Sequence, residues 1–147
     1  MQIETTRFGT VAIEVDDILL FPQGLVGFEK CRHWVLLADD DNESLGWLQC
    51  VNHAEVALPV ISPRRFLPDY KVRLQRGQIL PLELTQFDQA FVLTIVGRGD
   101  DELTVNLKAP LILNLDRRLG RQVVTSDEQP ISLPILDRTV APLRKSA

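Results

Sequence analysis

The apolar residues of this chain recur with the spacing of β-strands. In two stretches, 9–15 and 103–109, every second residue is apolar, as expected where one face of a sheet meets a core. In the first stretch, Val11, Ile13 and Val15 are predicted to share the buried face. The spacing therefore favours sheet structure over helix.

Other segments are continuous apolar runs, which are typical of strands buried on both faces. They lie at 34–38, 56–61, 91–96 and 111–113. Turn-forming residues at 39–42 and 97–101 separate apolar segments, so both are predicted to be hairpin connections. Pro110 interrupts a further apolar stretch and predicts an edge, a bulge or a corner between two sheets.

Nine prolines are scattered along the chain. A proline inside a helix removes a hydrogen-bond donor and clashes with the preceding turn, so long helices are disfavoured. Only 84–90 is predicted to form a short helical turn. The sequence thus predicts an all-β fold, a single-domain, mostly antiparallel small β-barrel or sandwich with at most one short helical turn.

Length and composition fit one folded domain. The chain has 147 residues, of which 45% are hydrophobic and 24% charged. A chain of this size can bury about 70% of its unfolded surface without disulfides or metals. We assign residues 1–136 to a β-barrel binding domain, and residues 137–147, which have little periodicity, to a peripheral or flexible C-terminal tail.

Targeting signals are not recognisable in the sequence. No apolar run approaches the ~20 residues that cross a bilayer, and the first residues lack the basic and apolar regions of a secretory signal. We therefore expect a cytoplasmic protein with no membrane partner. In that reducing compartment the two cysteines are expected to be thiols.

Charge is distributed unevenly. Residues 1–60 contain three Lys/Arg and ten Asp/Glu, whereas residues 61–147 contain thirteen and ten. With a formal net charge of −4, the chain is poorly suited to a phosphate backbone, so no direct nucleic-acid binding is expected. Trp34 and Trp47 lie in the acidic part, which argues against aromatic platforms beside a basic RNA groove. An acidic surface favours a basic protein partner instead.

Candidate catalytic groups are few. The only histidines, His33 and His53, lie in no recognisable catalytic motif, and the sequence contains no nucleophile elbow, phosphate-binding loop or dinucleotide fingerprint. We therefore expect no enzyme activity and no cofactor.

One set of residues offers an alternative function. Cys31, His33, Cys50 and His53 supply the two sulfurs and two imidazoles of a structural zinc site. A full hairpin is predicted between the two pairs, and a chain of this size needs no metal to fold, so we expect no metal site. The alternative is a zinc-stabilised or small-ligand-binding β-barrel domain.

Two loops place large apolar residues beside residues that control the backbone. Residues 21–29 hold two glycines three apart, which predicts a tight, packed loop. In residues 62–70, two prolines flank Phe66 and lead to Tyr70. These aromatic residues are predicted either to plug an end of the barrel or to form an exposed docking edge.

Four segments, taken in order, form a more specific pattern. They are Phe21 to Glu29, Leu48 to Cys50, Pro63 to Tyr70, and Asn106 to Asn114 with Gly120 to Val124 following. Together they resemble the family of the flagellar assembly factor FliW, over about residues 3–136. The most specific feature is the run Asn-Leu-x-Ala-Pro that begins at Asn106, downstream of Pro-Asp-Tyr.

The resemblance implies a mostly antiparallel β protein of the cytosol that has no catalytic activity and binds two partners, flagellin and the translational regulator CsrA. It also implies partner switching. While cytosolic flagellin is abundant it occupies the protein, and after export the freed protein sequesters CsrA and relieves repression of flagellin mRNA. The family suggests allosteric antagonism, which the residues themselves do not distinguish from direct blockage.

Candidate partner-binding residues lie on two segments. They are Phe66, Asp69, Tyr70, Lys71, Thr104, Asn106 and Leu107. We expect the aromatic pair and the strand at 104–107 to form an exposed sheet edge that accepts a flagellin segment through main-chain hydrogen bonds.

Several of these residues have a second interpretation. Asp69 either caps a turn or contacts a partner, and Lys71 is either a determinant of charge preference or an ordinary exposed residue. Asn106 and Asn114 are predicted to satisfy backbone groups near the bend at Pro110, because asparagine side chains commonly do so at turns.

Overall fold

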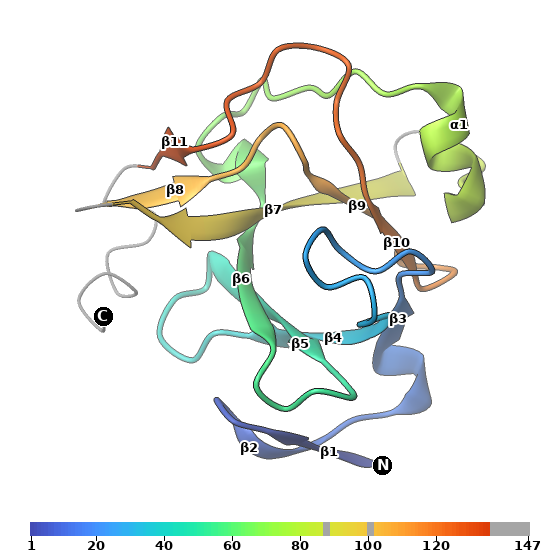
Figure 1. Ribbon diagram of the computed structural model, residues 1–147, viewed down its shortest axis with the longest axis vertical. Helices are drawn as coiled ribbons and strands as arrows, with labels where there is room; N and C mark the ends of the chain where they lie inside the picture. The colour runs from blue at the N-terminus through green and yellow to red at the C-terminus, as the bar shows by residue number, and fades with distance from the viewer. Residues whose placement is uncertain (87–88, 100–101, 136–147) are drawn as a thin grey trace.

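The computed structural model describes residues 1–86, 89–99 and 102–135 and is built almost entirely of strands (Figure 1). The strands are β1 (Gln2–Thr5), β2 (Gly9–Ala12), β3 (Ile18–Leu20), β4 (His33–Ala38), β5 (Leu45–Cys50), β6 (Ala57–Ile61), β7 (Ala90–Arg98), β8 (Leu103–Val105), β9 (Leu111–Asn114), β10 (Leu119–Gln122) and β11 (Leu133–Pro134). One α-helix, α1 (Arg76–Ile79), and three short 3₁₀ turns, η1 (Val15–Asp17), η2 (Pro63–Arg65) and η3 (Leu80–Leu82), complete the described elements. The predicted all-β class is confirmed.

Seven of the strands close into a barrel. Their order is β3, β4, β5, β6, β7, β9 and β10, and β10 returns to β3. Every pairing is antiparallel except the last, in which β10 lies parallel to β3 with Leu119 opposite Leu20. Of the two predicted architectures, barrel and sandwich, the chain therefore adopts the closed one.

Strand β7 belongs both to the barrel and to a flap beside it. Its first half pairs with β9, from Ala90 opposite Asn114 onward. Its end pairs with β8, which in turn pairs with β11. The connection from the flap back to the barrel passes through Pro110, so the predicted corner is confirmed.

Large side chains from the 21–29 loop and the barrel strands fill the barrel. Phe21, Leu25 and Trp34 are almost completely buried. The loop bends at Gly24, which has a φ of +65°, and the Gly24 N–H donates to the Phe21 carbonyl oxygen at 2.8 Å. Strand β10 passes so close that a Cβ at Gly120 would overlap the Phe21 ring. The packed loop predicted from the sequence is confirmed.

Two local predictions are wrong, and a third holds only in part. Val15 is 70% exposed, because the chain leaves β2 at Ala12 and bends into η1. Leu36 is half-exposed, so β4 is not buried on both faces. The alternation at 103–109 holds in part, since Leu103, Val105, Leu107 and Ala109 are buried and Asn106 and Lys108 are half-buried, but Thr104 is buried as well and β8 ends at Val105.

The described α-helix lies upstream of the predicted helical turn. It occupies Arg76–Ile79 and continues into η3. Residues 87–88 of the predicted turn, and residues 137–147 of the predicted tail, lie outside the described residues.

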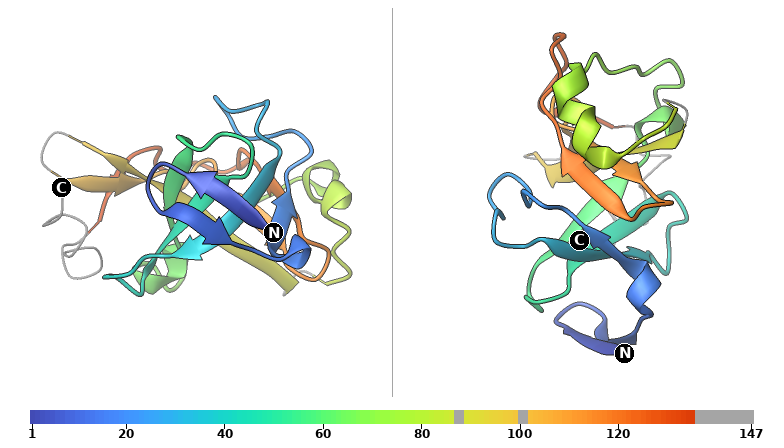
Figure 2. Two further views of the ribbon diagram at one scale, coloured as in Figure 1. Left: turned by 90° about the horizontal axis from the view of Figure 1, so that it is seen from below. Right: turned by 90° about the vertical axis from the view of Figure 1, so that its right-hand side faces the viewer.

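The two ends of the molecule are formed by different parts of the chain. Figure 2 shows the β1–β2 hairpin at one end and α1, with the connection that leads to it, at the other. Within the described ranges, no helix has the length and apolar character needed to cross a membrane.

Candidate functional site

The segment that follows β6 is fixed to the barrel by Tyr70. The Tyr70 ring is 7% exposed, and its hydroxyl donates to the Leu107 carbonyl oxygen at 2.7 Å. Burial, and to a smaller extent the Asp127 carboxylate, raises the pKa of the Tyr70 phenol above its usual value. Tyr70 is therefore an interior residue, so its ring does not form the exposed docking edge that was one of the two roles predicted for it.

The same segment is held from its other side by residues 125–130. The Ser126 N–H and hydroxyl both donate to the Arg73 carbonyl oxygen, at 2.9 and 2.8 Å. The Gln129 amide donates to the Lys71 carbonyl oxygen at 3.2 Å. These contacts leave the Lys71 and Arg73 side chains facing solvent. The sequence analysis missed this arrangement, because nothing local in residues 125–130 signals pairing with a segment more than 50 residues away.

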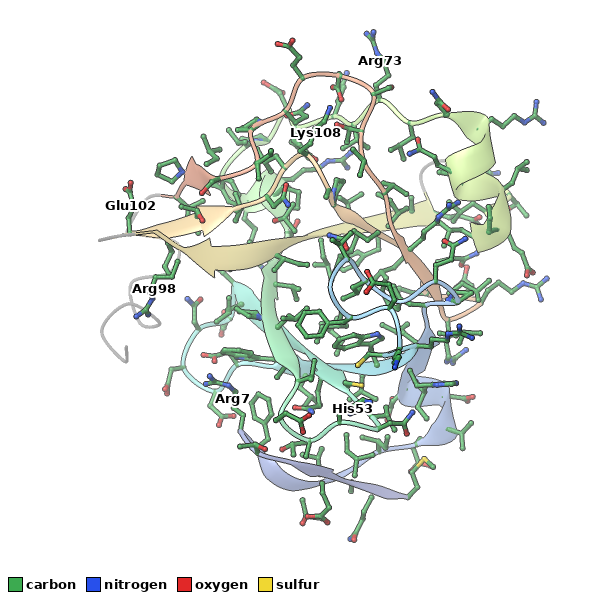
Figure 3. The ribbon with its side chains drawn as sticks, viewed as in Figure 1. Arg7, His53, Arg73, Arg98, Glu102 and Lys108 are labelled. Carbon is green, nitrogen blue, oxygen red and sulfur yellow. The ribbon has the colours of Figure 1, made fainter. Side chains whose placement is uncertain are left out.

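Lys108, labelled in Figure 3, continues the same set of contacts. Its ammonium group donates to the carbonyl oxygens of Thr125 and Asp127, at 2.9 and 2.6 Å. The connection between β8 and β9 and the segment before β11 are thus tied together. The backbone of the whole region is held in one arrangement before any partner arrives.

The predicted docking residues divide into buried and exposed groups. Tyr70, Thr104 and Leu107 lie in the interior, whereas Asp69 and Lys71 are exposed and Phe66 is half-buried. The expected free edge at 104–107 is wrong, since β11 pairs with β8 there and Leu107 N–H donates to the Pro130 carbonyl oxygen at 3.0 Å. A role of these residues in partner binding stays a prediction.

Both asparagines near the bend serve the backbone, as predicted. Asn106 Oδ1 accepts the N–H groups of Lys108 and Ala109, each at 3.1 Å. The Asn114 amide donates to the carbonyl oxygens of Leu82 and Glu83, at 2.8 and 3.3 Å. The first side chain acts only as an acceptor, whereas the second ties η3 to β9 mainly as a donor.

The four residues of the alternative zinc site do not come together. Cys31 and Cys50 are buried in the barrel core, while His33 and His53 are exposed. Burial, with a smaller effect from a hydrogen bond to Cys50, raises the pKa of the Cys31 thiol to about 11. In the part of the chain that the structure describes, no three His, Cys, Asp or Glu side chains are grouped to hold a metal. The geometry does not support the zinc alternative.

The acidic hairpin 39–42 has one carboxylate with a structural role. Asp39 accepts the Asp41 and Asn42 N–H groups at Oδ2 and the Trp47 indole N–H at Oδ1. Asp40 and Asp41 are exposed. Arg7 lies over the Trp47 ring, 4.0 Å from its centroid. The hairpin is therefore well ordered and presents free negative charge to solvent.

Comparisons with known proteins agree with this geometry. The family model described as FliW protein matches residues 2–135. A flagellar assembly factor FliW from Bdellovibrio bacteriovorus is 40% identical, over 95% of this chain and 84% of the relative, and one from Natranaerobius thermophilus is 34% identical, over 84% of each. A crystal structure of a flagellar assembly factor FliW superposes with a TM-score of 0.83 at 28% identity, covering 91% of this chain and 96% of that one. The chain belongs to the FliW family.

Proposed function

We propose that this protein binds flagellin in the cytosol before export and antagonises CsrA by partner switching, without catalysing a reaction. The observation that carries the proposal is the family match, which extends from residue 2 to residue 135. The relatives reported above are named flagellar assembly factors. The proposal is that this assembly role depends on two protein partners, flagellin and CsrA.

Switching requires only that the two binding events be linked. If flagellin weakens CsrA binding by some factor, CsrA must weaken flagellin binding by the same factor. The chain offers two regions of opposite charge, the acidic residues 1–60 and the cation-rich segment 61–80. The two regions adjoin at the acidic hairpin, where Leu45 pairs with Ile61 and Arg65 donates to the Ser44 hydroxyl at 3.4 Å, so binding events on these neighbouring surfaces can be linked.

The acidic region is suited to a basic regulator. Residues 1–60 contain ten carboxylates and three cations. Asp40 and Asp41 at the 39–42 hairpin are among the exposed carboxylates. Complementary potentials raise the association rate and suppress wrong partners, so we assign CsrA to this acidic region.

For flagellin we favour the segment 66–71. Its exposed residues, Asp69 and Lys71, and the half-buried Phe66 are available for contact. Tyr70, whose hydroxyl donates to the Leu107 carbonyl oxygen, holds the segment in position from the interior. These five candidate residues thus have two roles, contact for Phe66, Asp69 and Lys71 and positioning for Tyr70 and Leu107.

The test is a competition experiment with purified components. The full chain is titrated with labelled flagellin monomer, then with CsrA, and the ternary mixture is measured in both orders of addition. We expect binding of each partner alone and a reciprocal loss of affinity when the other is present. Recovery of neither partner, or full binding of both at once with unchanged affinities, would contradict the proposal. A pull-down from cells before and after flagellin export is blocked checks the same exchange in vivo.

A further inference from the structure

A groove with an apolar floor runs beside the segment 71–74. One hollow of about 640 Å³ lies between this segment and the barrel strands, with Val72, Leu84, Val92 and Ile112 among its lining residues. A second hollow of about 520 Å³ adjoins it beneath α1 and η3. The two hollows share Leu74, Ile79 and Leu84. They therefore form one elongated groove rather than two separate pockets.

The rim of this groove carries positive charge. Arg64, Lys71 and Arg73 line the first hollow, and Arg76 lines the second. Among the described residues, none of these four cations has an ion-pair partner. Glu83 is the one carboxylate among the described lining residues, and it pairs with Arg117 at 3.9 Å. The rim thus offers several cations whose charge the chain itself leaves unpaired.

The walls of the groove are held in place from outside. Arg121 donates to the carbonyl oxygen of Gln78 in α1 at 2.8 Å, and the Gln78 side chain donates to the Val124 carbonyl oxygen at 2.9 Å. Ser126 holds Arg73 as described above. A groove that is already formed loses little conformational entropy when it is filled, which favours binding.

We propose that this groove is the docking site for a segment of flagellin that presents apolar side chains along one face and carboxylates at its margins. The inference rests on the proposed function and specifies the surface for one partner. An amphipathic helix binds such a groove through apolar side chains on one face, at positions i, i+3 or i+4, and i+7 of the helix. The carboxylates beside that face would meet the cations of the rim.

Other occupants fit the groove less well. The chain's own residues 136–147 contain three Lys/Arg and one Asp, so the rim would repel them. RNA would be drawn to the cations but leaves an apolar floor uncovered, whereas a protein segment satisfies both. A second copy of this chain could offer its acidic end, and the test below distinguishes that case.

The test compares two single charge reversals in the full chain. Arg73 lies on the rim, and Arg98 lies at the outer end of β7, far from the groove (Figure 3). Both are exposed, so neither R73E nor R98E should disturb folding. We expect R73E to weaken flagellin binding about fivefold or more at low salt, and R98E to change it less than about twofold. Leu80, 63% exposed at the second hollow, supplies L80S, which should weaken binding at every salt concentration.

Each of the other outcomes contradicts the assignment of this groove to flagellin. If the wild-type chain binds flagellin and R73E and L80S bind equally well, the groove assignment is wrong while the proposed function stands. If the wild-type chain does not bind flagellin at all, the proposed function and this occupant both fail. If R73E instead abolishes binding of a short RNA, or converts a sedimenting dimer to a monomer, the groove serves nucleic acid or self-association and the inference is overturned.

Discussion

The Tyr70 hydroxyl donates a 2.7 Å hydrogen bond to the carbonyl oxygen of Leu107, 37 residues further along the chain. This bond joins the segment that leads to the groove with the corner between flap and barrel. One side chain thus sets the position of residues on which both proposed contacts with flagellin depend.

Removing that hydroxyl should be costly. In Y70F the buried Leu107 carbonyl oxygen loses its tyrosine donor, and we expect the free energy of unfolding to fall by about 1–3 kcal/mol. Urea denaturation at neutral pH measures the change. The control is T10V, which removes an exposed hydroxyl that meets only the Glu4 carboxylate and should cost less than about 0.5 kcal/mol. Equal stability of Y70F and wild type would show that the bond does not contribute.

Alkaline pH should destabilise the fold through two buried groups. Burial raises the pKa of Cys31 from 9.0 to about 11 and raises that of Tyr70 above 10.0. From pH 9 upward the unfolded chain therefore binds fewer protons than the folded one, and the free energy of unfolding falls as pH rises. Each group contributes a slope of at most about 1.4 kcal/mol per pH unit.

Variants of Cys31 and Tyr70 show which group causes the fall of the free energy of unfolding with pH. C31A should flatten the fall between pH 9 and 11, and Y70F should flatten it above pH 10, whatever their stability at pH 7. H53Q, which changes an exposed side chain, should leave the slope as it is. Denaturation curves collected across this range check the prediction, and an unchanged slope in both C31A and Y70F contradicts it.

Substitution by aspartate should affect the stability of the protein differently at Asn106 and at Asn114. Asn106 acts as an acceptor for two N–H groups, so N106D keeps both bonds and should be nearly neutral, whereas N106A should lose about 1–2 kcal/mol. Asn114 donates to two carbonyl oxygens, so N114D places a carboxylate against acceptors and should cost about 3 kcal/mol or more. Thermal unfolding of the three variants is the measurement, and equal effects of the two aspartates would contradict these roles.

Two glycines make a matched pair for alanine. At Gly120 a Cβ would overlap the Phe21 ring, so G120A should destabilise by about 1–3 kcal/mol. At Gly77, inside α1, nothing lies within 4 Å of the added carbon. G77A should therefore be neutral or stabilise by about 0.4–1 kcal/mol, since it restricts the unfolded chain. Destabilisation of both variants by a similar amount would show that the Phe21 contact is not the cause.

Association with CsrA should depend on salt. If the acidic region within residues 1–60 steers a basic regulator, raising the salt concentration from low to physiological slows association by about tenfold. The pair D40N/D41N removes two exposed charges of the 39–42 hairpin, and we expect it to slow association at low salt about two- to fivefold. E102Q, on the flap, serves as control (Figure 3). Stopped-flow mixing measures the rate, and a rate that does not change with salt contradicts the assignment.

Much of the barrel could be predicted because its strands are short apolar runs bounded by turn residues. At Val15 the apolar alternation in the sequence does not correspond to a strand. The apolar alternation continues past Ala12, but Asp17 accepts the Glu14 N–H at 2.8 Å and bends the chain into η1. The alternation of apolar and polar residues does not predict a turn that a single carboxylate side chain stabilises.

The candidate site was harder to predict from the sequence, because it depends on contacts between segments that are distant along the chain. Strand β11 has two residues, one of them a proline, and carries no periodic signal, yet it covers the edge predicted at 104–107. The groove is also assembled from separate parts of the chain, η2 to η3, β7 and β9. The sequence identified Lys71 and the excess of cations after residue 60, but not the hollow that these cations border.

The single parallel pairing has a consequence for how the protein is made. Leu119 and Leu20, which meet at the seam between β10 and β3, are separated by most of the described chain. On a ribosome, the sheet stays open until β10 emerges, and long-range pairings of this kind form late because the loop they close is long. Amide hydrogen exchange should therefore be fastest along this seam among the barrel strands, and a nascent chain gains its closed surface only after β10 has been made.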